Sequence, residues 1–370
     1  MPDLEIPFND LSRHEPDVAG RVRSAVNRVV DSGRYVLGPE VEGFETEFAA
    51  YCQRRHCVAL GNGTDALELA LRAVGVGAGT RVGTVANAGM YTTAATLAIG
   101  ATPVYIDVDS ADHNLSLELL RDDTFASLGA LVITHLYGRM ANMPAICERA
   151  KRHGVPIIED CAQAHGANLG GRPAGSWGAA GCFSFYPTKN LGALGDAGAV
   201  VSSDGEIAEK VRLLREYGWS RRGVTALGGG RNSRMDEIQA AVLRVKLAEL
   251  DRWTGQRRAI RRVYDAALGA TSLGRPAPPD DSESDVTHLY VVASENRSAL
   301  VSRLAAAGIS TQVHFPIPDH KQVAASGRFA IGTALNNTEW LGERVLSLPC
   351  FLAMTEEEIG HVAAALASES

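Results

Sequence analysis

Short apolar runs alternate with amphipathic segments along the first two-thirds of the chain. Residues 58–60 form one such run, and the segment 64–74 that follows repeats apolar residues at the i, i+3, i+4, i+7 spacing of a helix. Similar runs predict buried strands at 81–86, 104–108, 130–134, 155–159, 181–185 and 198–202, with helical patterns between them. Buried strands that alternate with helices are typical of a largely parallel sheet covered on both faces.

The pattern changes in the last third of the chain. A long helix is predicted from about Met235 to Leu250, and 252–267 continues in helical style. After a proline-rich loop signal, the pattern predicts further elements at 288–294 (strand), 297–307 (helix), 311–314 (short strand) and from Thr355 (helix, with Glu358 completing a capping box). We therefore predict a large domain over 1–250, N-terminal segment included, and a smaller α+β domain over 251–370.

Composition narrows the classes of partner. The 370 residues are 45% hydrophobic, which is enough for a substantial core. The net charge of −7, from 36 basic and 43 acidic residues, argues against nucleic acid as a partner. Local basic groups could still bind a small anion: Arg221 and Arg222, or the cluster Arg257, Arg258, Arg261 and Arg262. For that cluster we favour a solvated helix face.

The cysteines give no sign of a metal site. No C-x-x-C pair and no zinc-type spacing occurs among Cys52, Cys57, Cys147, Cys161, Cys182 and Cys350. Residues 1–10 lack the basic and apolar regions of a signal peptide, and no apolar run approaches membrane-spanning length. A soluble cytoplasmic protein without a membrane partner is the expectation.

Ligands of open α/β sheets bind at the carboxyl ends of strands, so the residues that follow the predicted strands are the candidates for a site. The first such segment, Gly61 to Leu67, opens a predicted helix. Its glycines allow close approach of a ligand, and Thr64 together with the free N–H groups of the first turn can bind an anion. An ordinary turn in which Thr64 or Asp65 caps the helix explains the same residues.

The second segment contains Glu159, Asp160 and Gln163. A carboxylate at the end of a buried strand is costly without a partner, and a pyridinium N–H is such a partner. Asp160 would then keep the ring protonated as an electron sink, and Gln163 could bond to its phenolic oxygen. The alternative is that Asp160 caps the following helix.

The third segment centres on Lys189, which follows an apolar strand and precedes a glycine-rich run. A lysine with little competing solvation has a depressed pKa and can act as an amine nucleophile. Ser184, upstream of it, can reach an anion. The alternative is a lysine whose side chain extends to the surface from the end of a strand.

In combination these segments resemble the DegT/DnrJ/StrS family of sugar aminotransferases. The motifs are Asn-Gly-Thr-Asp-Ala-Leu at 62–67, Glu-Asp-Cys-Ala-Gln-Ala-His-Gly at 159–166 and Phe-Ser-Phe-x-x-Thr-Lys-Asn at 183–190, with further similar blocks at 230–241, 313–320 and 346–349. The resemblance covers nearly the whole chain. It implies the aspartate aminotransferase-type fold of pyridoxal 5′-phosphate (PLP) enzymes, fold type I: a large, mostly parallel seven-stranded sheet domain with a smaller C-terminal α+β domain.

The resemblance also implies roles for residues. Lys189 looks like the Schiff-base lysine and proton shuttle, Asp160 matches the residue that faces the pyridine nitrogen, and Gln163 matches the one near the ring oxygen. Tyr91 is our choice for the aromatic that stacks on the ring, although its surroundings depart from the more usual Thr-Phe-x-Ala-Thr pattern. The phosphate is expected at Gly63, Thr64, Asp65 and Ser184.

Other roles concern the partner subunit and the substrate. Asn232 matches an asparagine that reaches the phosphate of the neighbouring subunit's cofactor, which implies a homodimer with shared active sites. His314 and His320 lie in a motif near the sugar nucleotide, where Phe315 replaces the usual tyrosine and puts a hydroxyl contact in doubt. An arginine should bind the donor carboxylate or the diphosphate, and the candidates are Arg234, Arg221 and Arg222.

The activity implied is a ping-pong transfer of an amino group from L-glutamate to a nucleotide-linked keto-6-deoxy sugar, with dTDP as the expected nucleotide. Some members of the family are dehydratases with histidine in place of the lysine, so Lys189 favours transamination. Amination at C4 of dTDP-4-keto-6-deoxyglucose is preferred because 87–91 departs from the pattern expected of C3 enzymes. Amination at C3, or a non-catalytic sugar-nucleotide sensor on the same fold, are the alternatives.

Overall fold

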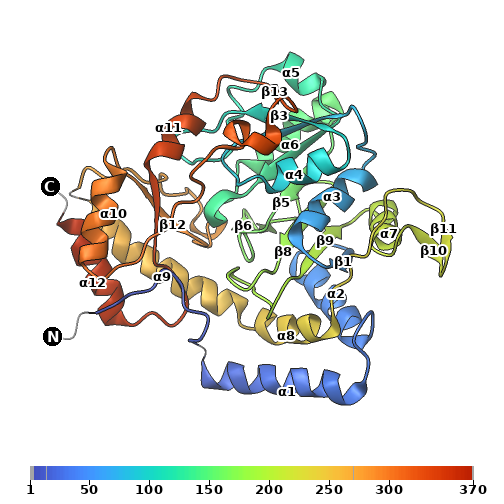
Figure 1. Ribbon diagram of the computed structural model, residues 1–370, viewed down its shortest axis with the longest axis horizontal. Coiled ribbons are helices and arrows are strands. Elements are labelled where there is room, and N and C mark those ends of the chain that lie inside the picture. Colours follow the sequence, from blue (N-terminus) through green and yellow to red (C-terminus); the bar gives the residue numbers. More distant parts are fainter. Residues whose placement is uncertain (1–3, 14, 270, 369–370) are drawn as a thin grey trace.

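The computed structural model describes residues 4–13, 15–269 and 271–368 of the chain (Figure 1). Residues 1–3, part of the segment searched for a signal peptide, lie outside that description. An eight-stranded sheet forms the centre of the larger part. Its strands, in spatial order, are β1 (His56–Leu60), β9 (Gly198–Ser202), β8 (Ala180–Ser184), β5 (Ile157–Asp160), β4 (Ala130–Thr134), β2 (Arg81–Val85), β3 (Thr102–Ile106) and β13 (Ala330–Ile331).

The sheet is mostly parallel, as predicted. Only β9 runs antiparallel to its neighbours, β1 and β8, and the other adjacent pairs are parallel. The eighth strand, beyond the seven expected, is β13, in which Ala330 and Ile331 pair with Val104 and Tyr105 of β3. A strand of two residues has no hydrophobic period, so the pattern of the sequence could not reveal it.

Helices cover both faces of the sheet because alternate strand residues point to opposite faces. Within β1, Val58 and Leu60 enter one buried cluster, whereas Cys57 and Ala59 enter another. The first cluster includes residues of α3 (Gly63–Ala73), α4 (Tyr91–Ala98) and α7 (Gly205–Leu214). The second includes residues of α2 (Pro39–Tyr51), α5 (Asp122–Ala126), α6 (Met143–His153) and α8 (Glu237–Leu247). The result is the three-layered α/β arrangement that the sequence predicts.

A third buried cluster lies in the C-terminal part, built by α9, α10 and α12 around the antiparallel pair β12 and β14. The elements of this part are α9 (Leu250–Leu268), β12 (Tyr290–Ala293), α10 (Arg297–Ala306), α11 (Asn336–Arg344), β14 (Val345–Leu348) and α12 (Glu356–Ala367). The capping box of Thr355 and Glu358 at the start of α12 is confirmed. The predicted continuous helix is two helices, α8 and α9, and the predicted strand at 311–314 is a single bridge between Gln312 and Ser347.

The N-terminal segment joins distant parts of the chain. Ile6 pairs in parallel with Ile309 and is buried in the C-terminal cluster. The next element, α1 (Pro16–Ser32), packs instead on α8, where Ala25 and Val29 meet Ala241. The segment therefore touches both of the predicted domains, and the division at residue 250 stays a prediction.

The remaining elements are short. Among them is the hairpin of β10 (Trp219–Arg221) and β11 (Val224–Thr225), which projects from the body of the molecule beyond α7 (Figure 1). The others are β6 (Asn168–Leu169), β7 (Arg172–Pro173), η1 (Leu136–Gly138), η2 (Ser282–Ser284), η3 (Asp319–Lys321) and η4 (Val323–Ala325). No helix within the described ranges has both the length and the apolar character that crossing a bilayer requires.

Candidate active site

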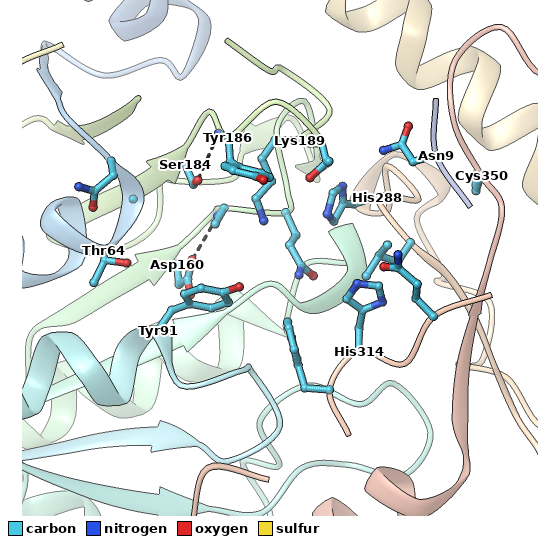
Figure 2. A pocket seen from close by; sticks show the side chains of 18 of the residues that line it. Asn9, Thr64, Tyr91, Asp160, Ser184, Tyr186, Lys189, His288, His314 and Cys350 are labelled. Carbon is cyan, nitrogen blue, oxygen red and sulfur yellow. Dashed lines mark hydrogen bonds between the residues drawn. The ribbon is translucent and has the colours of Figure 1, made fainter. Parts of the chain in front are cut away.

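A cavity of about 540 Å³ lies at the carboxyl ends of β5 and β8, where Asp160 and Ser184 end their strands (Figure 2). Its volume is in the range of cofactor and small-molecule sites. Eight of the residues predicted from the sequence line it: Gly63, Thr64, Tyr91, Asp160, Gln163, Ser184, Lys189 and His314.

Lys189 extends from the turn after β8 into this cavity and not to the outer surface (Figure 2). The turn is fixed by the backbone N–H of Lys189, which donates to the carbonyl oxygen of Tyr186 at 2.8 Å. Burial lowers the pKa of Lys189 to about 8, and the nearby carboxylate of Asp160 opposes this shift. The amine is therefore free of its proton in a substantial fraction of molecules at mildly alkaline pH.

Asp160 is buried, with 5% of its surface exposed, and has few partners for its charge. Its Oδ1 accepts from the N–H of Ala162 at 3.1 Å, and its Oδ2 accepts from the hydroxyl of Thr134 at 3.4 Å. Burial raises the pKa of Asp160, whereas the Ala162 N–H and the charge of Lys189 lower it. No helix begins at 161–167, so the capping alternative fails, and the carboxylate retains capacity for a donor from the cavity.

Glu159, the preceding residue, points to the other side of β5 and is fully buried. Its oxygens accept from the N–H groups of Gly175, Trp177 and Gly178 and bond to Nε2 of His135 at 3.1 Å. His135, Glu159 and Cys161 lie close enough for metal ligands, but these four donors already occupy the carboxylate. Glu159 thus holds the loop after β7 in place, while Asp160 faces the cavity.

The amide of Gln163 has a fixed orientation. Its Oε1 accepts from the backbone N–H of Tyr137 at 2.6 Å, so its NH₂ group remains as the donor. Tyr137 adopts a positive φ of 61° in η1, and its hydroxyl donates to the carbonyl oxygen of His314 at 2.6 Å. This residue therefore connects Gln163 with the C-terminal part of the cavity wall.

The start of α3 provides an anion site. The cap of this helix is Asn62, whose Oδ1 accepts from the N–H of Asp65 at 2.8 Å, so neither Thr64 nor Asp65 is the cap. A Cβ at Gly63 would stand 2.5 Å from the Cβ of Ser184, so only glycine allows this close approach. The hydroxyls of Thr64 and Ser184 flank the first-turn N–H groups, where the helix dipole favours an anion.

Tyr91 is the first residue of α4 and is half exposed at the cavity, with its ring centroid 6.0 Å from that of Phe315. Asp319 holds the start of this helix, a role that no sequence motif indicated. Its carboxylate accepts from the N–H of Met90 at 2.9 Å and from the hydroxyl of Thr93 at 2.6 Å. Asp319 thereby fixes the position from which Tyr91 reaches the cavity.

Four other residues with a predicted role do not line this cavity, and neither do the exposed candidate arginines Arg221 and Arg222. The carboxylate of Asp65 pairs with Arg231 at 3.1 Å, and Nε2 of His320 bonds to Glu339 at 2.9 Å. Asn232 is exposed, and Arg234 is partly buried. Within one subunit these four side chains have no direct access to the cavity.

The arginine cluster was only partly interpreted correctly. Arg257 is not on a solvated face: 5% of its surface is exposed, and it lines the cavity. It follows Trp253 by four residues and precedes Tyr264 by seven, so it belongs to the buried stripe of α9. That helical period was the signal that could have identified it. Its Nη1 donates to the carbonyl oxygen of Cys350 at 2.5 Å, and burial lowers its pKa.

Three further residues that no sequence motif indicated line the cavity: His288, Asn9 and Gln312. The ring of Phe8, beside Asn9, stacks on that of His314 with centroids 5.6 Å apart. His314 in turn bonds through Nδ1 to the hydroxyl of Ser347 at 2.9 Å. Burial, with the charge of Lys189, lowers the pKa of His314 to about 4, so this imidazole is neutral at physiological pH.

The model of the DegT/DnrJ/EryC1/StrS aminotransferase family matches residues 16–367. A similar protein is the dTDP-3-amino-3,4,6-trideoxy-alpha-D-glucose transaminase of Streptomyces venezuelae, 44% identical over 345 residues, or 93% of this chain and 90% of the relative. The crystal structure of DesV from S. venezuelae with a ketimine intermediate superposes with a TM-score of 0.93 at 42% identity, covering 98% of each chain. NtdA from Bacillus subtilis, with bound cofactor PMP, has a TM-score of 0.88 at 26% identity, covering 98% and 84%.

Proposed function

This chain belongs to the DegT/DnrJ/EryC1/StrS aminotransferase family, and on that premise we propose that it transfers the amino group of L-glutamate to C3 of a dTDP-linked 3-keto-6-deoxy sugar. Its family, and relatives that are named as nucleotide-sugar transaminases, give the class: the chain is a PLP-dependent nucleotide-sugar aminotransferase. The sensor alternative is thereby set aside. The donor, the nucleotide and the carbon that receives the nitrogen are the proposed parts.

The name of the 44% identical relative, a 3-amino sugar transaminase, is the observation that carries the choice of C3. The unusual stretch 87–91 favours C4 when the sequence is considered alone. In the structure this stretch packs against the C-terminal wall, since a Cβ at Gly89 would stand 2.7 Å from the ring of Phe315. An adaptation to that neighbour explains the unusual sequence without a change of the carbon aminated, so we give the similarity to the 3-amino enzyme more weight.

The cavity residues fit pyridoxal 5′-phosphate from one end to the other. Asp160, with its spare acceptor capacity, suits a protonated ring nitrogen, and the NH₂ group of Gln163 suits the phenolic oxygen. The hydroxyls of Thr64 and Ser184 and the start of α3 suit the phosphate. When bound, the cofactor supplies an electron-withdrawing ring that stabilises negative charge at a neighbouring carbon.

Lys189 performs the proton transfers in this proposal. As a neutral amine it would remove the proton from the α-carbon of glutamate and deliver it to the C4′ carbon of the cofactor. In the second half-reaction it would move a proton in the opposite direction, from C4′ to the sugar carbon that receives the nitrogen. Burial makes the amine available near pH 8, close to the working range of a general base.

A homodimer completes the proposed site. Asn232 is exposed and has no access to its own cavity, which suits a role at the partner's phosphate. Four residues further along the chain, Asp236 bridges to Val36, and Val30, Tyr35 and Val36 are exposed apolar side chains. An exposed apolar surface is what a second copy of the chain would cover.

The regiochemistry test uses the purified holoenzyme with L-glutamate and either a 3-keto or a 4-keto dTDP-6-deoxyhexose. We expect an amino sugar only from the 3-keto compound, identified by NMR of the product. A 4-amino product would overturn the choice of C3. Consumption of glutamate in a half-reaction without amination of either sugar would overturn the proposed acceptor class and leave the enzyme class standing.

A further inference from the structure

His288 is buried and lines the cavity together with Lys189, in a turn that is held from several sides (Figure 2). Arg257 donates through Nη1 to the carbonyl oxygens of Thr287 at 3.5 Å and His288 at 3.4 Å. The N–H of Thr287 donates to Asp285 at 2.7 Å, and a Cβ at Gly138 would stand 2.8 Å from the backbone nitrogen of His288. These contacts fix the backbone from which the imidazole projects.

Asn190 fixes which ring nitrogen of His288 carries the proton. Its Nδ2 donates to the carbonyl oxygen of Val286 at 3.3 Å, so its Oδ1 must be the atom that faces Nδ1 of His288 at 3.1 Å. An amide oxygen only accepts hydrogen bonds, so Nδ1 of His288 is the donor. Nε2 therefore carries the lone pair of a neutral imidazole.

The ring remains neutral because its surroundings disfavour a positive charge. Burial lowers the pKa of His288 well below its usual value, and the charges of Lys189 and Arg257 lower it further. His165 and His314 face the same lysine, and burial with the charge of Lys189 lowers their pKa values as well. Asp160, across the cavity, is the negative group that acts on Lys189.

His288 and Lys189 extend into the same part of the cavity from neighbouring segments of its wall (Figure 2). Of the other two histidines, His165 packs against Phe183 and Phe185, and His314 already uses Nδ1 to bond to Ser347. Among these three imidazoles, only the ring of His288 is bonded to Asn190, the residue that follows Lys189 in the sequence. This bond leaves Nε2 of His288 as the acceptor. The lone pair on Nε2 of His288 is therefore suited to accept a hydrogen bond from the amine of Lys189, which loses and regains protons during the reaction.

We propose that His288 is a positioning residue for Lys189: when the lysine amine is free, its Nζ–H donates to Nε2 of His288, and Asn190 keeps the imidazole in the accepting tautomer. The inference rests on the proposed role of Lys189 as the base. With one N–H directed to His288, the lone pair of the amine points to the α-carbon of the donor. His288 takes up no proton, and the proton removed from carbon is held on Nζ until Lys189 returns it to carbon.

The test compares His288→Leu, which removes the acceptor, with His288→Gln, whose amide can replace both hydrogen bonds. We expect the half-reaction with glutamate, followed by the absorbance of the bound cofactor, to slow by about tenfold or more in the leucine variant with little change in KM. The glutamine variant should recover most of the rate. His153→Leu, a change on α6 outside the cavity, serves as the control.

A second readout needs neither cofactor nor sugar. In the apoprotein, the pH dependence of Lys189 acylation reports its pKa, which should fall in His288→Leu because the ammonium loses an acceptor. Nitrogen NMR of ¹⁵N-histidine-labelled wild-type protein should place the His288 proton on Nδ1, even if the leucine variant does not fold. A proton on Nε2, or an unchanged rate and acylation profile in a folded leucine variant, would overturn the proposal. Failure of sugar amination alone would refute only the proposed function.

Discussion

Burial acts on both charged groups of the cavity in the same sense, because it favours the neutral form of each. The pKa of Lys189 is lowered, the pKa of Asp160 is raised, and each charge partly offsets the effect on the other. Without a bound ligand, the site therefore holds two incompletely solvated charges. Such a site lowers the stability of the apoprotein and gives a ligand that neutralises both charges a large effect on folding.

The buried ammonium group of Lys189 should lower the free energy of unfolding of the apoprotein. Lys189→Met should stabilise the apoprotein at pH 7 by about 2 kcal/mol, because the variant no longer buries an ammonium group. The pKa of Lys189 is about 8 in the fold against an ordinary 10.5, so between these values the unfolded chain binds more protons. The free energy of unfolding of the wild type therefore rises with pH in this window. As a result, the gap in stability between the wild type and Lys189→Met becomes smaller.

Urea unfolding of both apoproteins at pH 7 and pH 10 measures the gap. Lys151→Met, at an exposed lysine on α6, is the matched control and should show no gap at either pH. A difference that is equally large at both pH values would mean that the ammonium is not the source.

Asp160 faces the cavity, whereas its neighbour Glu159 holds the loop after β7. Amide variants of the two residues should therefore affect different properties, activity in one case and stability in the other. Asp160→Asn should slow the glutamate half-reaction by about 100-fold or more, since an amide cannot hold a ring nitrogen protonated. Glu159→Gln should mainly lower the free energy of unfolding, by about 3 kcal/mol, because its amide nitrogen cannot accept the N–H bonds of the loop. Stopped-flow spectra and urea unfolding of both variants are the measurements, and an interchange of the two effects would contradict these assignments.

At the scale of elements, the start of α3 can approach β8 closely only because residue 63 is a glycine. Gly63→Ala would place a Cβ 2.5 Å from that of Ser184, so the helix start or β8 must shift. We expect the affinity of the apoprotein for PLP to fall by about tenfold or more, because the phosphate site loses its geometry. Gly77→Ala is the control, since a Cβ there meets nothing within 4 Å. Equal PLP titrations for both variants would count against a phosphate site at α3.

The strands and helices that carry the site could be predicted because their patterns are local. The runs ending at Asp160 and Ser184, and the helix after Gly61, are in the structure where the periods place them. What the sequence could not supply were contacts across long separations. His288 bonds to a residue 98 positions away, and Thr93 to Asp319 at a separation of 226. Such pairs leave no period, so the roles of His288 and Asp319 became visible only in the fold.

Arg257 is a different kind of miss, because its signal was local. Its position on the buried stripe of α9 was readable from the spacing to Trp253 and Tyr264. The charges of Arg258, Arg261 and Arg262 around it suggested a solvated face instead. When a charged residue falls on an apolar period, the period deserves more weight, since a guanidinium can be satisfied by carbonyl oxygens as it is here.

For the whole molecule, the proposed dimer predicts that assembly and cofactor binding are linked. Tyr35→Glu should convert the protein to monomers, because a charge on the apolar surface formed by Val30, Tyr35 and Val36 would be buried without a partner. Since Asn232 would then no longer reach a phosphate, PLP should bind more weakly in the monomer. Sedimentation velocity with and without PLP measures both effects.

Val323→Glu, at a residue that is 91% exposed, is the control and should leave assembly unchanged. Subunit mixing adds an independent reading: Lys189→Ala and Asn232→Ala subunits, each inactive alone, should regain activity together, because the hybrid contains one site with both residues. A lack of any recovery on mixing would argue against sharing of the site.

The bridge between Ile6 and Ile309 also sets an order of events during synthesis. Ile6 leaves the ribosome early, but its partner follows about three hundred residues later, and the neighbouring Phe8 and Asn9 reach the cavity wall through the same segment. The sheet can form while translation continues, whereas this wall must wait for the C-terminal third of the chain. A nascent chain stalled before residue 309 would hold Lys189 and all strands of the central sheet except β13. It would lack the N-terminal part of the cavity wall, so the enzyme becomes competent only at the end of its own synthesis.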